Sequence, residues 1–223
     1  MNERVRTHEA PVVSLPVKGT WKLIESPGRE RFAFDLVAAS SGMERTRGKS
    51  RVEAILDRAN GGHSCDKSMR VYAPITGTVV RADDSSPDRQ RFSLLRDAWA
   101  IASSRSRPDP DDIGRFAANH VIIQGAGSYA FVAHIQHRSL QVTEGDKVEA
   151  GQVIARVGNS GAALGPHLHF QLFDQIDDFV AATAVPFLVS EYERWTGEGW
   201  EQVRYAALRK GELMQAMPGS RTS

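Results

Sequence analysis

Short strand-like segments that end at glycine or proline recur along this chain, and they constrain its fold more than any other feature. Large apolar side chains recur with a period of two at Phe32, Phe34 and Leu36, between Arg31, Ala33 and Asp35, which is typical of a strand with one more apolar face. Further segments of this kind follow, at residues 71–73, 76–81, 120–124, 129–135, 142–148, 151–158 and 167–173. The pattern predicts a mainly β protein, built as an antiparallel sandwich or barrel.

Two parts of the chain break this rhythm. Residues 83–118 place a helical patch between two acidic, proline-containing turns, which indicates an inserted flap. After Asp174 the pattern favours loop and helix, with a helix around Glu191–Trp195 and a frayed tail from about Gly211. The expected organisation is an N-terminal extension at 1–19, a domain at 20–190 that carries the flap, and a C-terminal helix and tail at 191–223.

Composition narrows the classes of function. The 223 residues carry 28 Lys and Arg against 27 Asp and Glu, so no strong positive field exists to hold a nucleic acid. The single cysteine, Cys65, excludes an internal disulfide and a zinc site built from several thiolates. Neither an export signal nor an apolar run of about 20 residues is found, so we expect no membrane span and, by default, a cytoplasmic monomer.

The sharpest local signal is a His-x-His pair in Gly165 to Phe170. Side chains two residues apart on a strand share a face, so His167 and His169 should lie side by side, about 7 Å apart along the strand. One imidazole could ligate a metal while the other polarises a substrate or water; alternatively, both are ordinary surface histidines. Asp35 and His134, on other expected strands, favour a functional site.

Several segments of the chain occur together in a familiar order. They are residues 71–80, 119–123, 132–135, 142–152, 157–161 and 165–170. In this order and style the chain resembles the M23 (LytM/lysostaphin-like) zinc metallopeptidases, over roughly residues 20–190. The resemblance implies an antiparallel β fold of the duplicated-hybrid-motif type, with a groove above the sheet for a peptide, usually a peptidoglycan cross-link.

The same resemblance implies Zn2+ as the cofactor and assigns roles to four residues. Asp35 and His169 would ligate zinc, and His134 and His167 would be catalytic, orienting the water and stabilising the developing oxyanion. A zinc ion with three protein ligands keeps a fourth position for water and polarises the peptide carbonyl.

One position departs from the family pattern. Four residues before Asp35, where the family places a ligand histidine, this chain has Arg31, whose guanidinium has no lone pair to offer a metal. Another side chain could replace the histidine, and His63, with Cys65 beside it, is the nearest candidate in the sequence. Alternatively, the zinc site is crippled and Arg31 pairs with Asp35.

Three hypotheses follow. The first is a zinc-dependent endopeptidase acting on cell-wall-like peptides, and the second is a catalytically degenerate relative that binds a peptide or regulates a partner. A carrier or phosphotransfer module is the third, but no lysine stands at a hairpin tip as a lipoyl site would need. Among the other histidines, His120 is expected to be structural and His137 to be exposed to solvent.

Overall fold

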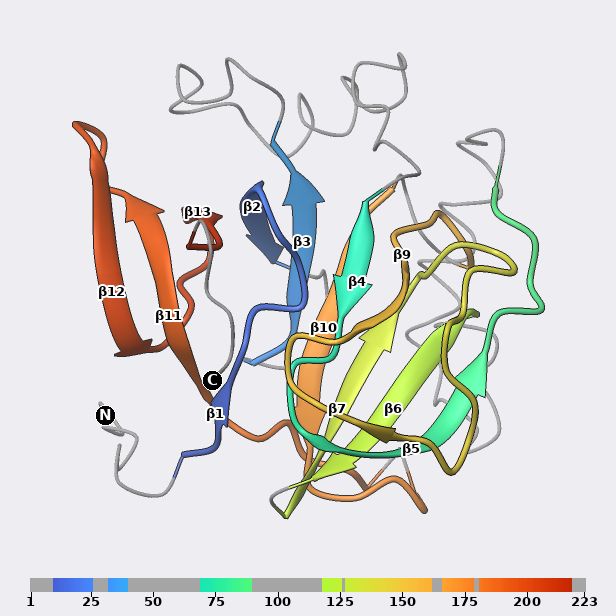
Figure 1. Ribbon diagram of the computed structural model, residues 1–223. Helices are drawn as coiled ribbons and strands as arrows, with labels where there is room; N and C mark the ends of the chain where they lie inside the picture. Colours follow the sequence, from blue (N-terminus) through green and yellow to red (C-terminus); the bar gives the residue numbers. More distant parts are fainter. Residues whose placement is uncertain are drawn as a thin grey trace.

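The computed structural model describes residues 10–25, 32–39, 69–89, 118–125, 127–161, 166–178 and 181–217 (Figure 1). Every regular element in these residues is a β-strand, which confirms the mainly β prediction. These are β1 (Val12–Val13), β2 (Thr20–Glu25), β3 (Phe34–Ala38), β4 (Arg70–Tyr72), β5 (Gly77–Asp83), β6 (His120–Gly125), β7 (Ser128–Ala133), β8 (Lys147–Val148), β9 (Val153–Arg156), β10 (Leu168–Phe173), β11 (Leu188–Trp195), β12 (Trp200–Ala206) and β13 (Leu213–Gln215). In this part of the chain no helix could span a membrane.

One eleven-stranded sheet carries most of the fold. Its strand order is β1-β11-β13-β2-β3-β10-β7-β6-β5-β8, and β12 pairs with β11 off this path. The pairings are antiparallel except that of β1 with β11, which is parallel. Strands β4 and β9 form a second, two-stranded sheet in front of β10 and β7 in Figure 1. The adjacency of β3, β10 and β7 determines which polar side chains can meet.

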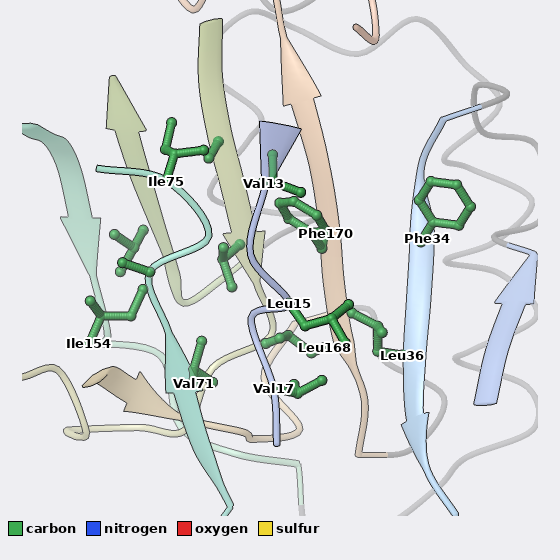
Figure 2. Packing of buried hydrophobic residues seen from close by; sticks show 14 of the residues in the cluster. Val13, Leu15, Val17, Phe34, Leu36, Val71, Ile75, Ile154, Leu168 and Phe170 are labelled. Carbon is green, nitrogen blue, oxygen red and sulfur yellow. The ribbon is translucent and has the colours of Figure 1, made fainter. Parts of the chain in front are cut away.

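The main core lies between the two sheets. On β10, Leu168 and Phe170 are fully buried and belong to the same apolar cluster as Val71 of β4 and Ile154 of β9 (Figure 2). Burial of each such side chain stabilises the fold by about 1.5 to 3 kcal/mol. The alternation of a strand turns His169 to the opposite face, so the apolar residues of β10 anchor the strand while its polar residues form a site.

Two glycines allow the backbones of the sheet to approach closely. A Cβ atom at Gly158 would overlap the backbone of Gln136, and one at Gly77 would overlap the carbonyl group of Gln124. Only glycine fits such positions without moving the neighbouring chain. At Gly158 the close approach lets the backbone N–H donate a hydrogen bond to the carbonyl of His134 at 3.1 Å.

The expected C-terminal helix is wrong. Residues Leu188–Trp195 form β11, which pairs along its length with β12 and on its other side with β1 and β13. Tyr192 is fully buried in the main core, and Met214 of β13 is too. The residue pattern around Glu191 wrongly predicted a helix, because backbone hydrogen bonds to three separate strands stabilise the extended form.

The ends of the expected domain can be placed only in part. Val13, Leu15 and Val17, which the sequence assigned to an N-terminal extension, pack into the main core (Figure 2). Most of the expected helical flap, residues 90–117, lies outside the described residues. The domain limits at 20 and 190 therefore stay predictions.

Candidate metal and catalytic centre

The two residues expected to ligate zinc lie on neighbouring strands and contact each other. Asp35 of β3 and His169 of β10 are direct partners in the antiparallel register. Side chains of such cross-strand partners project to the same face. Asp35 Oδ1 lies 2.8 Å from His169 Nδ1, and the exposed fractions of the two side chains are 18% and 2%. A carboxylate oxygen and an imidazole nitrogen thus meet where both side chains are largely shielded from solvent.

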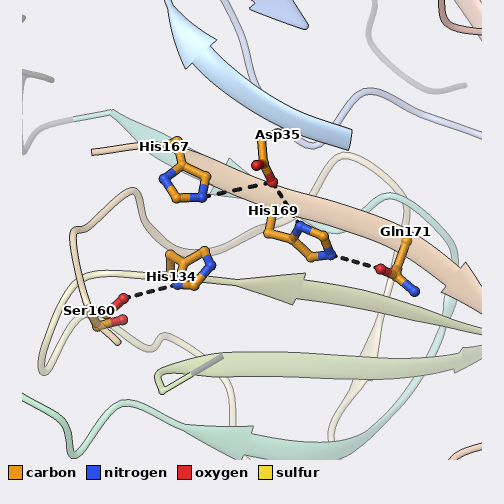
Figure 3. Close-up of polar contacts among 6 residues, drawn as sticks. All are labelled: Asp35, His134, Ser160, His167, His169 and Gln171. Atoms are coloured by element: carbon orange, nitrogen blue, oxygen red, sulfur yellow. Dashed lines mark hydrogen bonds and ion pairs between the residues drawn. The ribbon is translucent and has the colours of Figure 1, made fainter. Parts of the chain in front are cut away.

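The two histidines expected to be catalytic lie beside this pair (Figure 3). His167 Nε2 is 3.8 Å from Asp35 Oδ1, within ion-pair range. The ring of His134, which directly follows β7, lies with its centroid 4.6 Å from that of His167 and 6.3 Å from that of His169. The structure therefore brings all four sequence-predicted site residues into one cluster.

His134 is held in an unusual backbone conformation. Its φ angle is 64°, in the left-handed region that L-residues rarely adopt outside strained or functional sites. The ring Nδ1 lies 2.9 Å from the carbonyl oxygen of Ser160. Because a carbonyl oxygen only accepts, Nδ1 carries the proton and Nε2 keeps a lone pair. Burial, with the neighbouring His167 and His169, holds the pKa of His134 well below the usual value for histidine, so the ring is neutral at pH 7.

A buried polar network around Asn119 holds this conformation. The Asn119 side-chain amide donates to the carbonyl oxygens of Ser86 at 2.8 Å and Ile135 at 3.1 Å, and its Oδ1 accepts from the Ser86 N–H at 2.8 Å. Ser160 Oγ also donates to the Ile135 carbonyl, at 3.0 Å. Asn119 and Ser160 are fully buried. The carbonyl of Ile135, the residue that follows His134, therefore accepts hydrogen bonds from two buried side chains.

Sequence reasoning missed one residue of the site, Gln171. Its Oε1 lies 2.8 Å from His169 Nε2, on the side of the ring opposite Asp35 (Figure 3). Phe131 of β7 packs its ring at 5.7 Å and 65° against the same imidazole. The sequence contains a signal that could have identified Gln171. It follows His169 by two residues on a predicted strand, so the two side chains must share a face.

The donors fit zinc in part. A carboxylate and an imidazole are ordinary zinc ligands. Asp35 and His169 each have one such donor atom, and the two atoms lie 2.8 Å apart. Within the described ranges, however, no three His, Cys, Asp or Glu side chains form a group that could hold a metal ion. Arg31, His63 and Cys65, on which the question of a third ligand depends, lie outside those ranges.

The two other histidines in the described ranges take structural positions. His120 is buried, as expected of a structural residue, and its Nδ1 donates to the carbonyl of Ala118 at 2.8 Å. His137 was expected to be exposed to solvent, but it is half-buried. Its Nδ1 lies 2.9 Å from the carbonyl oxygen of Asp84, and this contact holds the ring against the loop after β5.

The cluster thus brings together one carboxylate and three imidazoles, which are groups that can ligate a metal or transfer protons. In a comparison with known families, the model of "Peptidase family M23" matches residues 106–179. This part of the chain is thus similar to the M23 peptidases, the family that the resemblance in sequence implied.

Three known proteins show what the chain is similar to. Peptidoglycan DD-endopeptidase ShyA of Vibrio cholerae serotype O1 is 39% identical over 57 residues, which are 26% of this chain and 13% of that protein. Lysostaphin of Staphylococcus simulans is 32% identical over 96 residues, which are 39% of this chain and 19% of that protein. A solved structure described as the novel M23 metalloprotease pseudoalterin from the deep sea is 17% identical, with a TM-score of 0.44 over 89% of this chain and 96% of that one. The chain thus spans a fifth or less of the length of these curated relatives.

Proposed function

We propose that this chain is a zinc-dependent metalloendopeptidase that hydrolyses peptide bonds in cell-wall-type peptides. The 2.8 Å contact between Asp35 Oδ1 and His169 Nδ1 carries the proposal, because it holds two zinc-type donors together beside His134 and His167. The match of residues 106–179 to the M23 peptidase family supports peptide hydrolysis. Similarity to a peptidoglycan DD-endopeptidase and to lysostaphin supports a cell-wall peptide as the substrate.

When bound, zinc supplies a Lewis acid that polarises a peptide carbonyl and activates water. Asp35 and His169 would hold the ion. His134 has the properties of a general base, because its Nε2 lone pair is unprotonated and its lowered pKa keeps the ring neutral at pH 7. It takes a proton from the attacking water and returns it to the leaving amine. His167, beside it, donates a hydrogen bond to the oxygen that gains negative charge.

The test combines zinc content with peptidase activity. We expect about one zinc per chain in the purified protein, measured by elemental analysis, and cleavage of purified peptidoglycan followed by chromatography. Asp35→Ala and His169→Ala should each lose both zinc and activity, because each removes a donor of the pair. His134→Ala should keep zinc and lower kcat by roughly 10²- to 10⁴-fold, the usual contribution of a general base.

His137→Ala is the matched control, because His137 is a half-buried histidine bonded to Asp84 and not to the cluster. It should keep both zinc and activity. If all of these variants cleave peptidoglycan as well as the parent chain, the proposed site is wrong.

A second function is favoured by one sequence observation, Arg31 at the position of the family's ligand histidine. A degenerate relative would keep this cluster of side chains and bind a peptide or regulate a partner without hydrolysis. Absence of zinc from the purified protein, together with calorimetric binding of peptidoglycan fragments in the presence of a chelator, would support this function over the first.

A further inference from the structure

We propose that Gln171 is a positioning residue that fixes the tautomer of His169, so that Nδ1 is presented beside Asp35 as a metal donor. This inference rests on the proposed function, in which His169 ligates zinc. It goes further by naming the group that decides which ring nitrogen is available.

The geometry of β10 makes Gln171 the natural partner of His169. The two residues are two positions apart on one strand, so their side chains project to the same face. Gln171 Oε1 lies 2.8 Å from His169 Nε2. An amide oxygen only accepts hydrogen bonds, so Nε2 must carry the proton and donate it. The nitrogen left for a metal is then Nδ1, whose 2.8 Å hydrogen-bond contact with the acceptor Asp35 Oδ1 would be replaced by coordination when a metal binds.

Burial strengthens the hydrogen bond between Gln171 and His169. His169 and Gln171 are 2% and 3% exposed, so water cannot easily replace the amide as a partner for Nε2. Phe131 lies directly opposite Gln171 in the strand register and packs against the His169 ring. In such a low-dielectric setting a single hydrogen bond is stronger than in water. Loss of the partner that orients a metal-binding histidine typically costs about 10- to 100-fold in metal affinity.

Two variants separate the acceptor oxygen from the volume of the side chain. Gln171→Met keeps a similar length and shape but has no acceptor oxygen, and we expect zinc affinity to fall by about 10- to 100-fold. Gln171→Glu keeps the acceptor, and we expect it to retain at least the parent affinity. The matched control is Gln124→Met, at an exposed glutamine of β6, which should leave the affinity unchanged. Affinity is measured by competition with a chromophoric zinc chelator.

A second readout needs no variant and no activity. Long-range ¹H–¹⁵N spectra of the imidazole rings report which nitrogen of His169 is protonated, with His169→Asn spectra for assignment. We expect Nε2 of the parent chain to carry a proton both without zinc and with it. An unprotonated Nε2 would overturn the inference, even if Gln171→Met does not fold.

The outcomes distinguish this inference from the proposed function. If the parent chain binds zinc and Gln171→Met binds it equally well, Gln171 has no positioning role and the proposed function is untouched. If the parent chain binds no zinc, the proposed function fails, while the protonation of His169 Nε2 in the zinc-free chain still decides the role of Gln171.

Discussion

At the scale of single residues, His120 and His134 share the same kind of surroundings although they lie on different strands or strand ends. His120 and His134 are buried, 6% and 7% exposed, and each gives its Nδ1 proton to a carbonyl oxygen. Burial is the main reason that both have a lowered pKa. The same environment that keeps His134 neutral at pH 7 therefore also makes the folded chain sensitive to acid.

This sensitivity predicts the pH dependence of stability. Unfolding exposes both rings, which then bind protons below about pH 6.5 that the folded chain does not bind. The free energy of unfolding should therefore be fully retained above pH 6.5 and fall on acidification, with each ring contributing at most about 1.4 kcal/mol per pH unit. Urea unfolding at pH 7.5 and pH 5.5, in the presence of a chelator, measures the fall.

The variant His120→Gln isolates one of the two rings. Its free energy of unfolding should fall less between pH 7.5 and pH 5.5 than that of the parent chain. A comparison at pH 8.5, where both rings are neutral, separates any packing defect from the proton linkage. Equal falls in the two proteins would show that His120 does not contribute.

At the scale of elements, the site depends on a polar junction between the start of β6 and the end of β7. Asn119 directly precedes β6, and its side chain bonds Ser86 and Ile135. Asn119→Ala should lower the free energy of unfolding by about 3 kcal/mol, because buried N–H and C=O groups lose their partners. It should also lower kcat without releasing zinc, since Asn119 contacts neither Asp35 nor His169 in these hydrogen bonds.

Urea unfolding and zinc content measure these two effects. Gln124→Ala, at an exposed position of the same strand, should change the free energy of unfolding by less than about 0.5 kcal/mol. A loss of zinc in Asn119→Ala equal to the loss of activity would mean that the junction supports the metal ligands and not His134.

At the scale of the whole molecule, the last three strands belong to the same sheet as the site. β13 pairs with β2, which pairs with β3, the strand of Asp35. Trp21 of β2 lies opposite Met214 of β13, and both are buried in the main core. The C-terminal strands are therefore a structural part of the fold that positions the site.

This arrangement predicts that a chain ending at Phe187 will not unfold as one cooperative unit. Removal of β11 to β13 would leave β2 without one neighbour and expose core side chains, including Trp21. Thermal unfolding followed by circular dichroism should show a broad transition, or none. Arg204→Ala, which removes only an exposed ion pair with Glu191, should unfold as the full chain does. A sharp transition in the shortened chain would identify the C-terminal strands as a separable appendage.

Much of the site was accessible from local patterns. Period-two alternation predicts that His167 and His169 share a face, and Asp35 and His134 could be chosen because they lie on other strands with the same pattern. Gln171 obeys the same rule and was missed, because an amide is not itself a metal ligand. The strand at 188–195 was mistaken for a helix, because its partners β1, β12 and β13 come from both ends of the chain.

The sequence by itself determined the strands between glycine corners and the face on which each polar side chain lies, because these follow from backbone geometry over a few residues. Only the tertiary structure decided that Asp35 meets His169, 134 positions later, that His134 adopts a left-handed conformation, and that Gln171 holds the His169 ring. These contacts depend on strand order and burial, which arise from the packing of the whole chain. Neither can be predicted from a short stretch of sequence.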